Sequence, residues 1–419
     1  MSMESKKLSV YLHSQLVGYL WIDEQNRFAF QYNPYYFLIA DAMVLSLSLP
    51  MREAPYTDDA AKAFFKNLLP EGEVRSLIAK IKQVSEHNDY KMLEAIGGEC
   101  AGAVTILPEG MTPRGDAGYT ALSIHELEKT IATQSHRPIL ILKDELRLSL
   151  AGAQNKIPLY IKDEALFLTT GDAPSSHILK PQSMYFSDMV QNEHFCMLLA
   201  KVIGLPVPAS FIWKGKKQFA YIVERYDRKQ LKDGTVERVH QEDFCQVLGR
   251  MPEQKYETEG GPSLNECRRI IETYSSSPVL DKEAFVKWVV FNYLIGNADA
   301  HGKNLSLIRE KEGGIRIAPF YDLISTSAYS ELVKKMAMRI GEEYRFKWIA
   351  ERHWRRMADQ LDIKFKYLRG VVLHTAETLD NQMACVAETV TEKYNGKITI
   401  ERICEVITTH ISRVRNCLN

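Results

Sequence analysis

A short polar stretch in the second half of the chain carries the side chains that phosphoryl transfer requires. It follows an apolar segment that ends near Asn297, and within it Asp299 and Asn304 lie five positions apart. Protein kinases use this spacing, H-R-D-x-x-x-x-N, for the carboxylate that orients the attacking hydroxyl and for an Asn that holds magnesium. A second carboxylate, Asp322, follows a predicted hairpin that would bring it close to Asn304. Taken alone, the stretch fits an exposed connection rich in Asp, Asn and Gly equally well.

A candidate phosphate-binding turn precedes this stretch. The run RLSLAGAQNKIPLYI places the small residues Ala151, Gly152 and Ala153 between two strand-like segments, with Lys156 close behind them. Small side chains allow backbone N–H groups to approach phosphate oxygens. Because the run matches neither G-x-x-x-x-G-K-S/T nor G-x-G-x-x-G, a plain β-turn is the alternative interpretation.

A strand lysine and a helix glutamate add to the pattern of a nucleotide-binding lobe. Lys180 ends the apolar run SSHILKP, and Glu193 opens the helical segment NEHFCMLLAKVIGL. In kinases a strand lysine binds phosphates and pairs with such a glutamate. The simpler interpretations are a solvated lysine at a strand end and a first-turn carboxylate that the helix dipole favours. Further along, the run AYIVERYDR suits a hinge whose backbone could hold a flat base.

The elements that must position these residues predict an α+β protein. Residues 1–110 alternate short strands and helices, residues 111–240 are mainly strands with one strong helix, and residues 241–419 are mostly helical. A mixed lobe followed by a helical lobe is the layout of a kinase. We therefore predict a small N-terminal subdomain, an ATP-binding mixed lobe and a helical C-terminal lobe that carries the catalytic loop.

Composition limits the class of protein. The 53 basic and 53 acidic residues balance, so the whole molecule has no electrostatic reason to coat nucleic acid or an anionic membrane. The N-terminus does not have the pattern of a signal peptide, and Asp41 interrupts the most apolar stretch, so we expect a cytoplasmic protein without a membrane anchor. Seven scattered cysteines without a CxxC pair argue against a disulfide framework and against a zinc site.

Together, these motifs resemble the HipA family of toxin kinases. In chain order they are LSLPM, FFKNLLPEG, GGECAGAVTILPEG, SLAGAQNKIPL, HILKP, NEHFCMLLA, VERYDR, GNADAHGKNLS and APFYDLIS. The resemblance covers nearly the whole chain and is firmest from Gly97 to Ser325. It implies a protein-kinase-like two-lobe fold of HipA type, in which a mixed α/β N-terminal lobe carries an extra N-terminal subdomain and the C-terminal lobe is all-α.

The resemblance also implies a role for each candidate site residue. Asp299 would be the catalytic aspartate, Asn304 and Asp322 the magnesium ligands, and Glu193 the possible ion-pair partner of Lys180. Ser149 matches the serine that family members autophosphorylate, a modification that ejects the phosphate loop and switches the kinase off. The implied ATP-binding residues are Ala151, Gly152, Ala153, Gln154, Asn155, Lys156, Lys180, Glu224, Arg225, Tyr226, His301, Gly302, Lys303, Asn304, Tyr321 and Asp322.

The implied cofactors are ATP and Mg2+, and the implied partners are of three kinds. They are a HipB-like helix-turn-helix antitoxin, a protein substrate that is typically an aminoacyl-tRNA synthetase such as the glutamyl enzyme, and operator DNA reached mainly through the antitoxin. Two alternatives stay open, namely a small-molecule kinase and a catalytically inactive corepressor that acts with an antitoxin on DNA. The basic, aromatic-containing residues 334–369 fit either a contact with DNA or tRNA or a solvated helix face.

Overall fold

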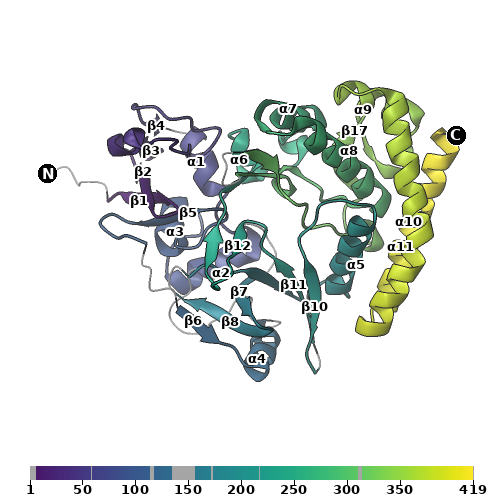
Figure 1. Cartoon of the computed structure of the whole chain (residues 1–419), viewed down its shortest axis with the longest axis horizontal. Helices are drawn as coiled ribbons and strands as arrows, with labels where there is room; N and C mark the ends of the chain where they lie inside the picture. Colours follow the sequence, from purple (N-terminus) through teal and green to yellow (C-terminus); the bar gives the residue numbers. More distant parts are fainter. Residues whose placement is uncertain are drawn as a thin grey trace. The chain divides into compact units, whose positions relative to one another are not determined.

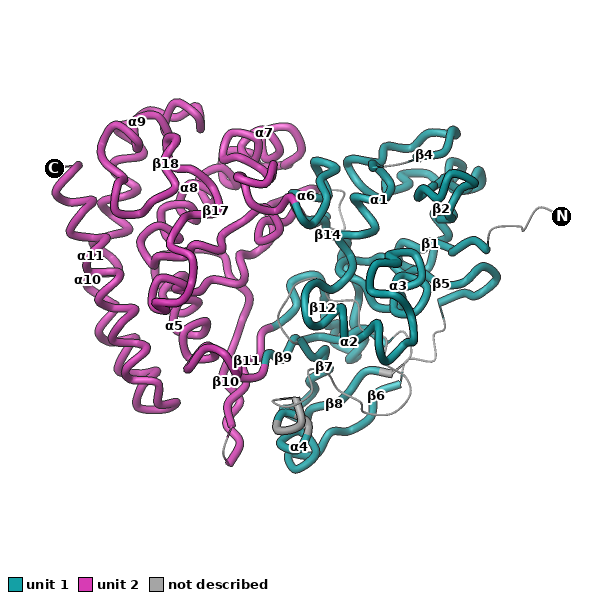
Figure 2. Tube along the Cα trace, turned by 180° about the vertical axis from the view of Figure 1, so that it is seen from behind, with its two compact units in different colours: residues 1–180, 224–253, 308–310 teal, residues 181–223, 254–307, 311–419 magenta. Residues whose placement is uncertain are grey.

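The chain forms two compact units, each assembled from separate segments (Figure 2). The computed structural model describes residues 6–57, 59–113, 118–134, 156–170, 173–216, 218–309 and 314–418. The first unit contains Met1–Lys180, Glu224–Glu253 and Ile308–Glu310, and the second contains Pro181–Val223, Gln254–Leu307 and Lys311–Asn419. The predicted division at residues 110 and 240 stays a prediction, because each unit draws on more than one of the predicted ranges. Ser149 and residues 151–155 of the predicted phosphate loop lie outside the described residues.

An antiparallel sheet of five strands forms the N-terminal part of the first unit (Figure 1). Its order is β4-β3-β2-β1-β5, with bounds Leu8–Leu12 (β1), Gln15–Ile22 (β2), Phe28–Tyr32 (β3), Tyr56–Thr57 (β4) and Val104–Pro108 (β5). Helices α1 (Asp59–Lys66) and α3 (Asp89–Ile96) contact this sheet, and α2 (Gly72–Lys82) lies between them in the chain. The rings of Phe30 and Phe65, both fully buried, lie 5.5 Å apart and join sheet and helix in one core.

A second antiparallel sheet in the first unit carries Lys180 at a strand end. Within this unit its order is β9-β7-β8-β6, with bounds Gly118–Ala121 (β6), Ile157–Lys162 (β7), Ala165–Thr170 (β8) and His177–Pro181 (β9). Ile157 pairs with Leu179, and both are buried, so the apolar pattern fixes the register. The other elements of this unit are η1 (Pro34–Leu38), α4 (Ile124–Gln134), β12 (Arg228–Gln230), β13 (Val236–Arg238), β14 (Gln241–Asp243) and α6 (Phe244–Val247).

Helices make up most of the second unit (Figure 1). They are α5 (Met189–Val202), α7 (Leu264–Tyr274), α8 (Pro278–Ile295), α9 (Glu351–Gln360), α10 (Phe365–Tyr394) and α11 (Lys397–Leu418). Helix α8 is buried on nearly all sides in its second half, from Trp288 to Ile295, as its continuous apolar sequence predicts for a core helix. The long helix α10 packs against α5, α8 and α11.

Short strands and single-turn helices lie between these helices. They are β10 (Ser210–Lys214), β11 (Phe219–Glu224), β15 (Ser306–Arg309), β16 (Ile315–Ile317), β17 (Lys335–Ile340), β18 (Glu343–Arg345), η2 (Pro252–Gln254), η3 (Glu257–Glu259), η4 (Gly302–Asn304), η5 (Thr326–Ala328) and η6 (Phe346–Trp348). Strands β15 and β16 are neighbours in a sheet, which confirms the predicted hairpin before Asp322. The mixed content of sheets and helices confirms the predicted fold class. Among the described residues, no helix has the length and the apolar character needed to cross a membrane.

Candidate active site

The segment that follows α8 positions Asp299 through the backbone. Gly296 ends the helix with a φ of +68°, and a Cβ at this position would lie 2.7 Å from the Cβ of Ser327, so the turn requires glycine. The side-chain oxygen of Asn297 then accepts a 2.9 Å hydrogen bond from the Asp299 N–H. The Asn297 amide in turn donates to the Asn292 side-chain oxygen at 2.8 Å. The chain thus leaves the core in a fixed direction, and the Asp299 side chain is 51% exposed at the surface.

Asn304 belongs to the same hydrogen-bonded loop but is buried. Its side-chain nitrogen donates to the Asp299 carbonyl at 2.9 Å, and its N–H donates to the His301 carbonyl at 2.9 Å. Because the side-chain NH2 makes this bond, the side-chain oxygen is the atom with which Asn304 can bind a cation. The loop therefore holds together an exposed carboxylate and a buried amide, two groups that phosphoryl transfer can use.

His301 and Tyr321 complete the surroundings of this loop. The His301 ring is buried, and its Nε2 lies 3.8 Å from Oδ1 of Asp299, a distance that allows an ion pair when the ring is protonated. The Tyr321 hydroxyl donates to the Lys303 carbonyl at 2.7 Å and lies 2.9 Å from the Ser306 hydroxyl. These two contacts join the segment after β16 to the segment in which β15 begins. The buried single turn η4 contains Gly302, Lys303 and Asn304.

Asp322 lies in the second unit, close enough to the buried Tyr221 hydroxyl to act on it electrostatically. Its φ is +53°, a left-handed conformation that is uncommon for a residue other than glycine and occurs often at functional sites. Burial raises the pKa of the Tyr221 hydroxyl well above its ordinary value, and the carboxylates of Glu193 and Asp322 raise it further. Both acidic residues therefore act on one buried phenol. A carboxylate oxygen is a ligand that magnesium prefers, so the chemistry of the Asp322 side chain fits a magnesium ligand.

Asn192 on helix α5 is a neighbour of this region that the sequence did not reveal. It is fully buried, and its side-chain nitrogen donates to the Ser325 carbonyl at 3.0 Å. The Ser325 N–H donates back to the Asn192 side-chain oxygen at 2.9 Å. The pair fixes the backbone three residues after Asp322. The sequence signal was weak, because Asn192 stands in the polar run from Gln191 to His194 and only its burial shows that the amide needs partners.

Lys180 and Glu193 are buried, with 5% and 4% of their surface exposed. The simpler interpretations are therefore wrong: Lys180 is not a solvated lysine, and Glu193 lies in the second turn of α5, which begins at Met189. Buried charges require charged or polar partners, so burial supports a functional or ion-paired role. The predicted ion pair between the two residues stays a prediction, because they belong to different units. Lys156, which precedes β7, is half-buried.

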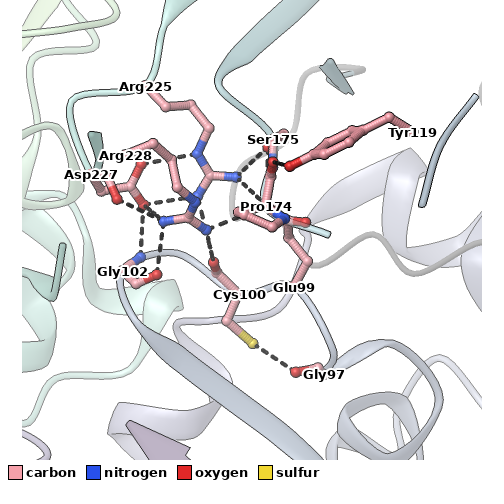
Figure 3. Close-up of polar contacts among 10 residues, drawn as sticks. All are labelled: Gly97, Glu99, Cys100, Gly102, Tyr119, Pro174, Ser175, Arg225, Asp227 and Arg228. Carbon is pink, nitrogen blue, oxygen red and sulfur yellow. Dashed lines mark hydrogen bonds and ion pairs between the residues drawn. The ribbon is translucent and has the colours of Figure 1, made fainter. Parts of the chain in front are cut away.

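A buried cluster of four charged side chains surrounds the predicted hinge (Figure 3). One oxygen of Glu99 accepts hydrogen bonds from Arg225 at 3.0 Å and from Arg228 at 3.3 Å. Asp227 accepts from both arginines, at 2.8 to 2.9 Å. The same Glu99 oxygen accepts the N–H and the hydroxyl of Ser175, at 3.1 and 3.0 Å. Burial alone would raise the pKa of Glu99, but the nearby arginines more than offset this effect, so its pKa is lowered.

This cluster gives Arg225 a structural role. Its guanidinium is bound to two buried carboxylates, and its N–H donates to the Ser176 carbonyl at 2.9 Å. Neither the guanidinium nor the backbone N–H of Arg225 is therefore directed to a nucleotide. Glu224 is exposed at the end of β11, and the Tyr226 hydroxyl donates to the Gln241 side-chain oxygen at 2.6 Å. If this segment holds an adenine, the hydrogen bonds must come from backbone groups of the segment other than the Arg225 N–H.

Tyr256 contacts the predicted catalytic aspartate, and no motif pointed to it. Its hydroxyl donates a hydrogen bond to Oδ1 of Asp299. Its ring meets the His301 ring edge to face, with centroids 5.2 Å apart. Tyr256 precedes Asp299 by 43 positions in an ordinary polar run, so only the folded chain reveals the contact.

Ion pairs occupy several arginines of the basic residues 334–369. The pairs are Arg339 with Glu257, Arg345 with Glu343, Arg355 with Glu351 and Arg356 with Glu342. Paired arginines at the surface are typical of a solvated face, where each pair adds little stability. The structure therefore favours this interpretation over a nucleic-acid contact for these four residues.

Comparison with known proteins covers both parts of the chain. Residues 8–107 match the HipA N-terminal domain family, and residues 148–411 match the HipA-like C-terminal domain family. The protein Y4mE of Sinorhizobium fredii is 35% identical over 418 residues, which is 99% of each chain.

Two further matches come from Shewanella oneidensis. Its serine/threonine-protein kinase toxin HipA is 32% identical over 313 residues, which is 72% of this chain and 71% of that protein. The solved complex of HipA, HipB and operator DNA from strain MR-1 contains a chain that matches with a TM-score of 0.82 and 26% identity, over 98% of this chain and 99% of that chain. Since two family models and a relative above 30% identity agree, the chain belongs to the HipA family.

Proposed function

We propose that the chain is an ATP-dependent serine/threonine protein kinase and the toxin of a HipA/HipB-type toxin-antitoxin pair. The observation that carries the proposal is the loop in which hydrogen bonds hold the exposed Asp299 carboxylate next to the buried Asn304 amide. Similarity to the S. oneidensis kinase toxin supports the choice of a protein kinase within the phosphotransferases. The protein would act in the cytoplasm.

In the proposed reaction Asp299 accepts a hydrogen bond from a serine or threonine hydroxyl and directs its oxygen toward the γ-phosphorus of ATP. A bond forms between this oxygen and the γ-phosphorus while the bond from the γ-phosphorus to the bridging oxygen of ADP breaks. The hydroxyl proton passes to Asp299 and then to solvent, which the 51% exposed side chain can reach. The products are a phosphoprotein and ADP.

ATP and Mg2+ are the cofactors in this proposal. Magnesium, when bound, would neutralise charge across the phosphates, and Asn304 and Asp322 would hold it. Lys180 would add positive charge at the phosphates, with Glu193 as its possible partner. The remaining nucleotide contacts would come from residues 151–156, from the backbone near Glu224 and Tyr226, and from His301, Gly302, Lys303 and Tyr321.

We also propose that Ser149 is the site of self-inactivation. A phosphate group on Ser149 would stand directly before the phosphate loop in the sequence. Its two negative charges would compete with ATP for the N–H donors of that loop. Phosphorylated chain would then bind ATP more weakly than unphosphorylated chain.

The proposed partners follow from the similarity to the S. oneidensis proteins. The S. oneidensis complex contains HipB and operator DNA, which supports a helix-turn-helix antitoxin for this chain and contact with DNA mainly through that antitoxin. The protein substrate would be an aminoacyl-tRNA synthetase such as the glutamyl enzyme. Its phosphorylation would block tRNA charging and arrest growth.

The test compares wild-type protein with Asp299→Asn, and with Asp362→Asn as a matched control at an exposed aspartate of the same unit. Each is incubated with magnesium and γ-phosphate-labelled ATP, with and without cell lysate, and phosphosites are mapped by mass spectrometry. We expect wild type and control to label Ser149 and a synthetase, and Asp299→Asn to be slower by about 10²- to 10⁴-fold.

Two other outcomes would replace the proposal. Label that enters small molecules of the lysate, and no protein, would indicate a small-molecule kinase. Binding of ATP without any transfer would indicate a corepressor that acts with its antitoxin on DNA.

A further inference from the structure

The loop from Gln254 to Gly261 is closed on itself by backbone hydrogen bonds. The Tyr256 carbonyl accepts the Glu259 N–H at 2.9 Å and the Gly261 N–H at 2.8 Å. A Cβ at position 261 would lie 2.5 Å from the Gln254 carbonyl oxygen and 2.6 Å from that of Tyr256. The closure therefore leaves no room for a side chain at Gly261, and its two hydrogen bonds fix the Tyr256 carbonyl.

Three contacts then dock this loop within the second unit. The Lys255 carbonyl accepts the Gly302 N–H of the catalytic loop at 3.2 Å. Glu257, whose side chain is 7% exposed, accepts hydrogen bonds from the N–H of Arg339 on β17 at 2.6 Å and from its Nε at 2.8 Å. The Tyr256 ring packs edge to face on His301. Tyr256 is thus positioned by its neighbours and not by its own hydroxyl.

We propose that Tyr256 is a positioning residue for Asp299, an inference that rests on the proposed kinase function. Its hydroxyl donates to Oδ1 of Asp299 and fixes the rotation of the carboxylate, which leaves Oδ2 to receive the acceptor hydroxyl. Such fixing matters because the Asp299 side chain is 51% exposed and the terminal torsion of an aspartate is broad when nothing holds it. A pre-set carboxylate removes an orientation cost from the transfer step.

The alternative role of this hydroxyl is to block the site. A carboxylate has about four lone-pair positions on two oxygens, so one phenol on Oδ1 leaves room for a substrate hydroxyl on Oδ2. Because the closed loop anchors Tyr256, the hydroxyl is poorly suited to swing away and return. These two roles predict opposite effects when the hydroxyl is removed: positioning predicts a slower enzyme and blocking predicts a faster one.

The decisive variant is Tyr256→Phe, which removes the hydroxyl and keeps the ring on His301. Label transfer from ATP is measured for the full chain at saturating and at varied ATP. We expect kcat to fall by about tenfold to a hundredfold and KM for ATP to stay within about twofold, because ATP binding does not use this hydroxyl. Tyr367→Phe, at a tyrosine on α10 that is 42% exposed, is the matched control and should keep wild-type kcat.

A second variant reaches Tyr256 through the backbone. Gly261→Ala should displace the loop and lower kcat by about tenfold to a hundredfold. The double variant with Tyr256→Phe should be little slower than either single variant, because both changes remove the same interaction between Tyr256 and Asp299. Thermal unfolding of each variant shows whether the fold is kept.

The outcomes separate the inference from the proposed function. A wild-type chain that transfers no phosphoryl group overturns both. Wild-type transfer with an unchanged or increased kcat in Tyr256→Phe overturns the positioning role alone. A rise in KM for ATP with kcat unchanged would assign Tyr256 to nucleotide binding and would also contradict the positioning role.

Discussion

Residues other than the proposed catalytic and metal-binding ones hold parts of the site in place. Asp299 is held by Asn297 at its N–H and by Tyr256 at its carboxylate. The backbone after Asp322 is held by Asn192. These supporting bonds decide the geometry of the site, since a carboxylate or an amide is useful in phosphoryl transfer only at a defined position.

Replacement of Asn192 by alanine tests this support. The change leaves the buried N–H and carbonyl of Ser325 without their amide partner, so we expect the free energy of unfolding to fall by about 2 to 4 kcal/mol. Kinase activity should fall as well, because the segment that carries Asp322 loses its attachment to α5. Thermal unfolding and label transfer measure the two effects. Asn381→Ala, at an exposed position of α10, is the control and should change neither.

At the scale of elements, the buried ion cluster joins three segments of the first unit (Figure 3). Glu99 lies in the loop between α3 and β5, Ser175 lies just before β9, and the two arginines follow β11. The cluster therefore sets where β9 begins, and β9 carries Lys180. Removal of one partner from such a cluster leaves an uncompensated buried charge, which is strongly destabilising.

The lowered pKa of Glu99 predicts how stability depends on pH. Its contribution is fully present above its ordinary pKa of 4.5 and is lost as the pH falls through the lowered folded value. Glu99→Gln should therefore reduce the pH dependence of Tm below about pH 5 and lower the free energy of unfolding at neutral pH by about 3 to 5 kcal/mol. Thermal unfolding between neutral and acidic pH measures both. The exposed Glu109→Gln should follow wild type, and a Glu99→Gln curve parallel to wild type would refute the assignment.

At the scale of the whole molecule, the sequence predicted what depends on local pattern. Apolar periodicity predicted α5, α8 and the strands β7 to β9, because burial of one face determines these elements. The spacing of Asp299 and Asn304 is also local. By contrast, Tyr256, Asn192 and Glu99 have partners 43, 133 and 126 positions away, and each is one polar residue in an ordinary run. Such contacts follow from the complete fold and not from any short segment.

Ligand binding by the whole chain provides a further prediction. Mg2+ and ATP together should raise Tm, and at about 100 times Kd the gain in unfolding free energy is about 2.7 kcal/mol. Asp322→Asn should weaken the magnesium dependence of this shift, because it removes a proposed ligand, while Asp362→Asn should keep it. Differential scanning fluorimetry with and without EDTA measures the effect. An equal shift with ATP alone would exclude the proposed magnesium ligands.

The way the chain alternates between the two units has a genetic consequence. It passes from one unit to the other after residues 180, 223, 253, 307 and 310, so no single cut in the gene separates one unit from the other. A stop codon before residue 224 removes residues of both units, whereas one after residue 310 removes residues of the second unit alone. Either unit can therefore be obtained by itself only by joining separate gene fragments, and every truncation allele removes residues of the unit that carries the catalytic loop.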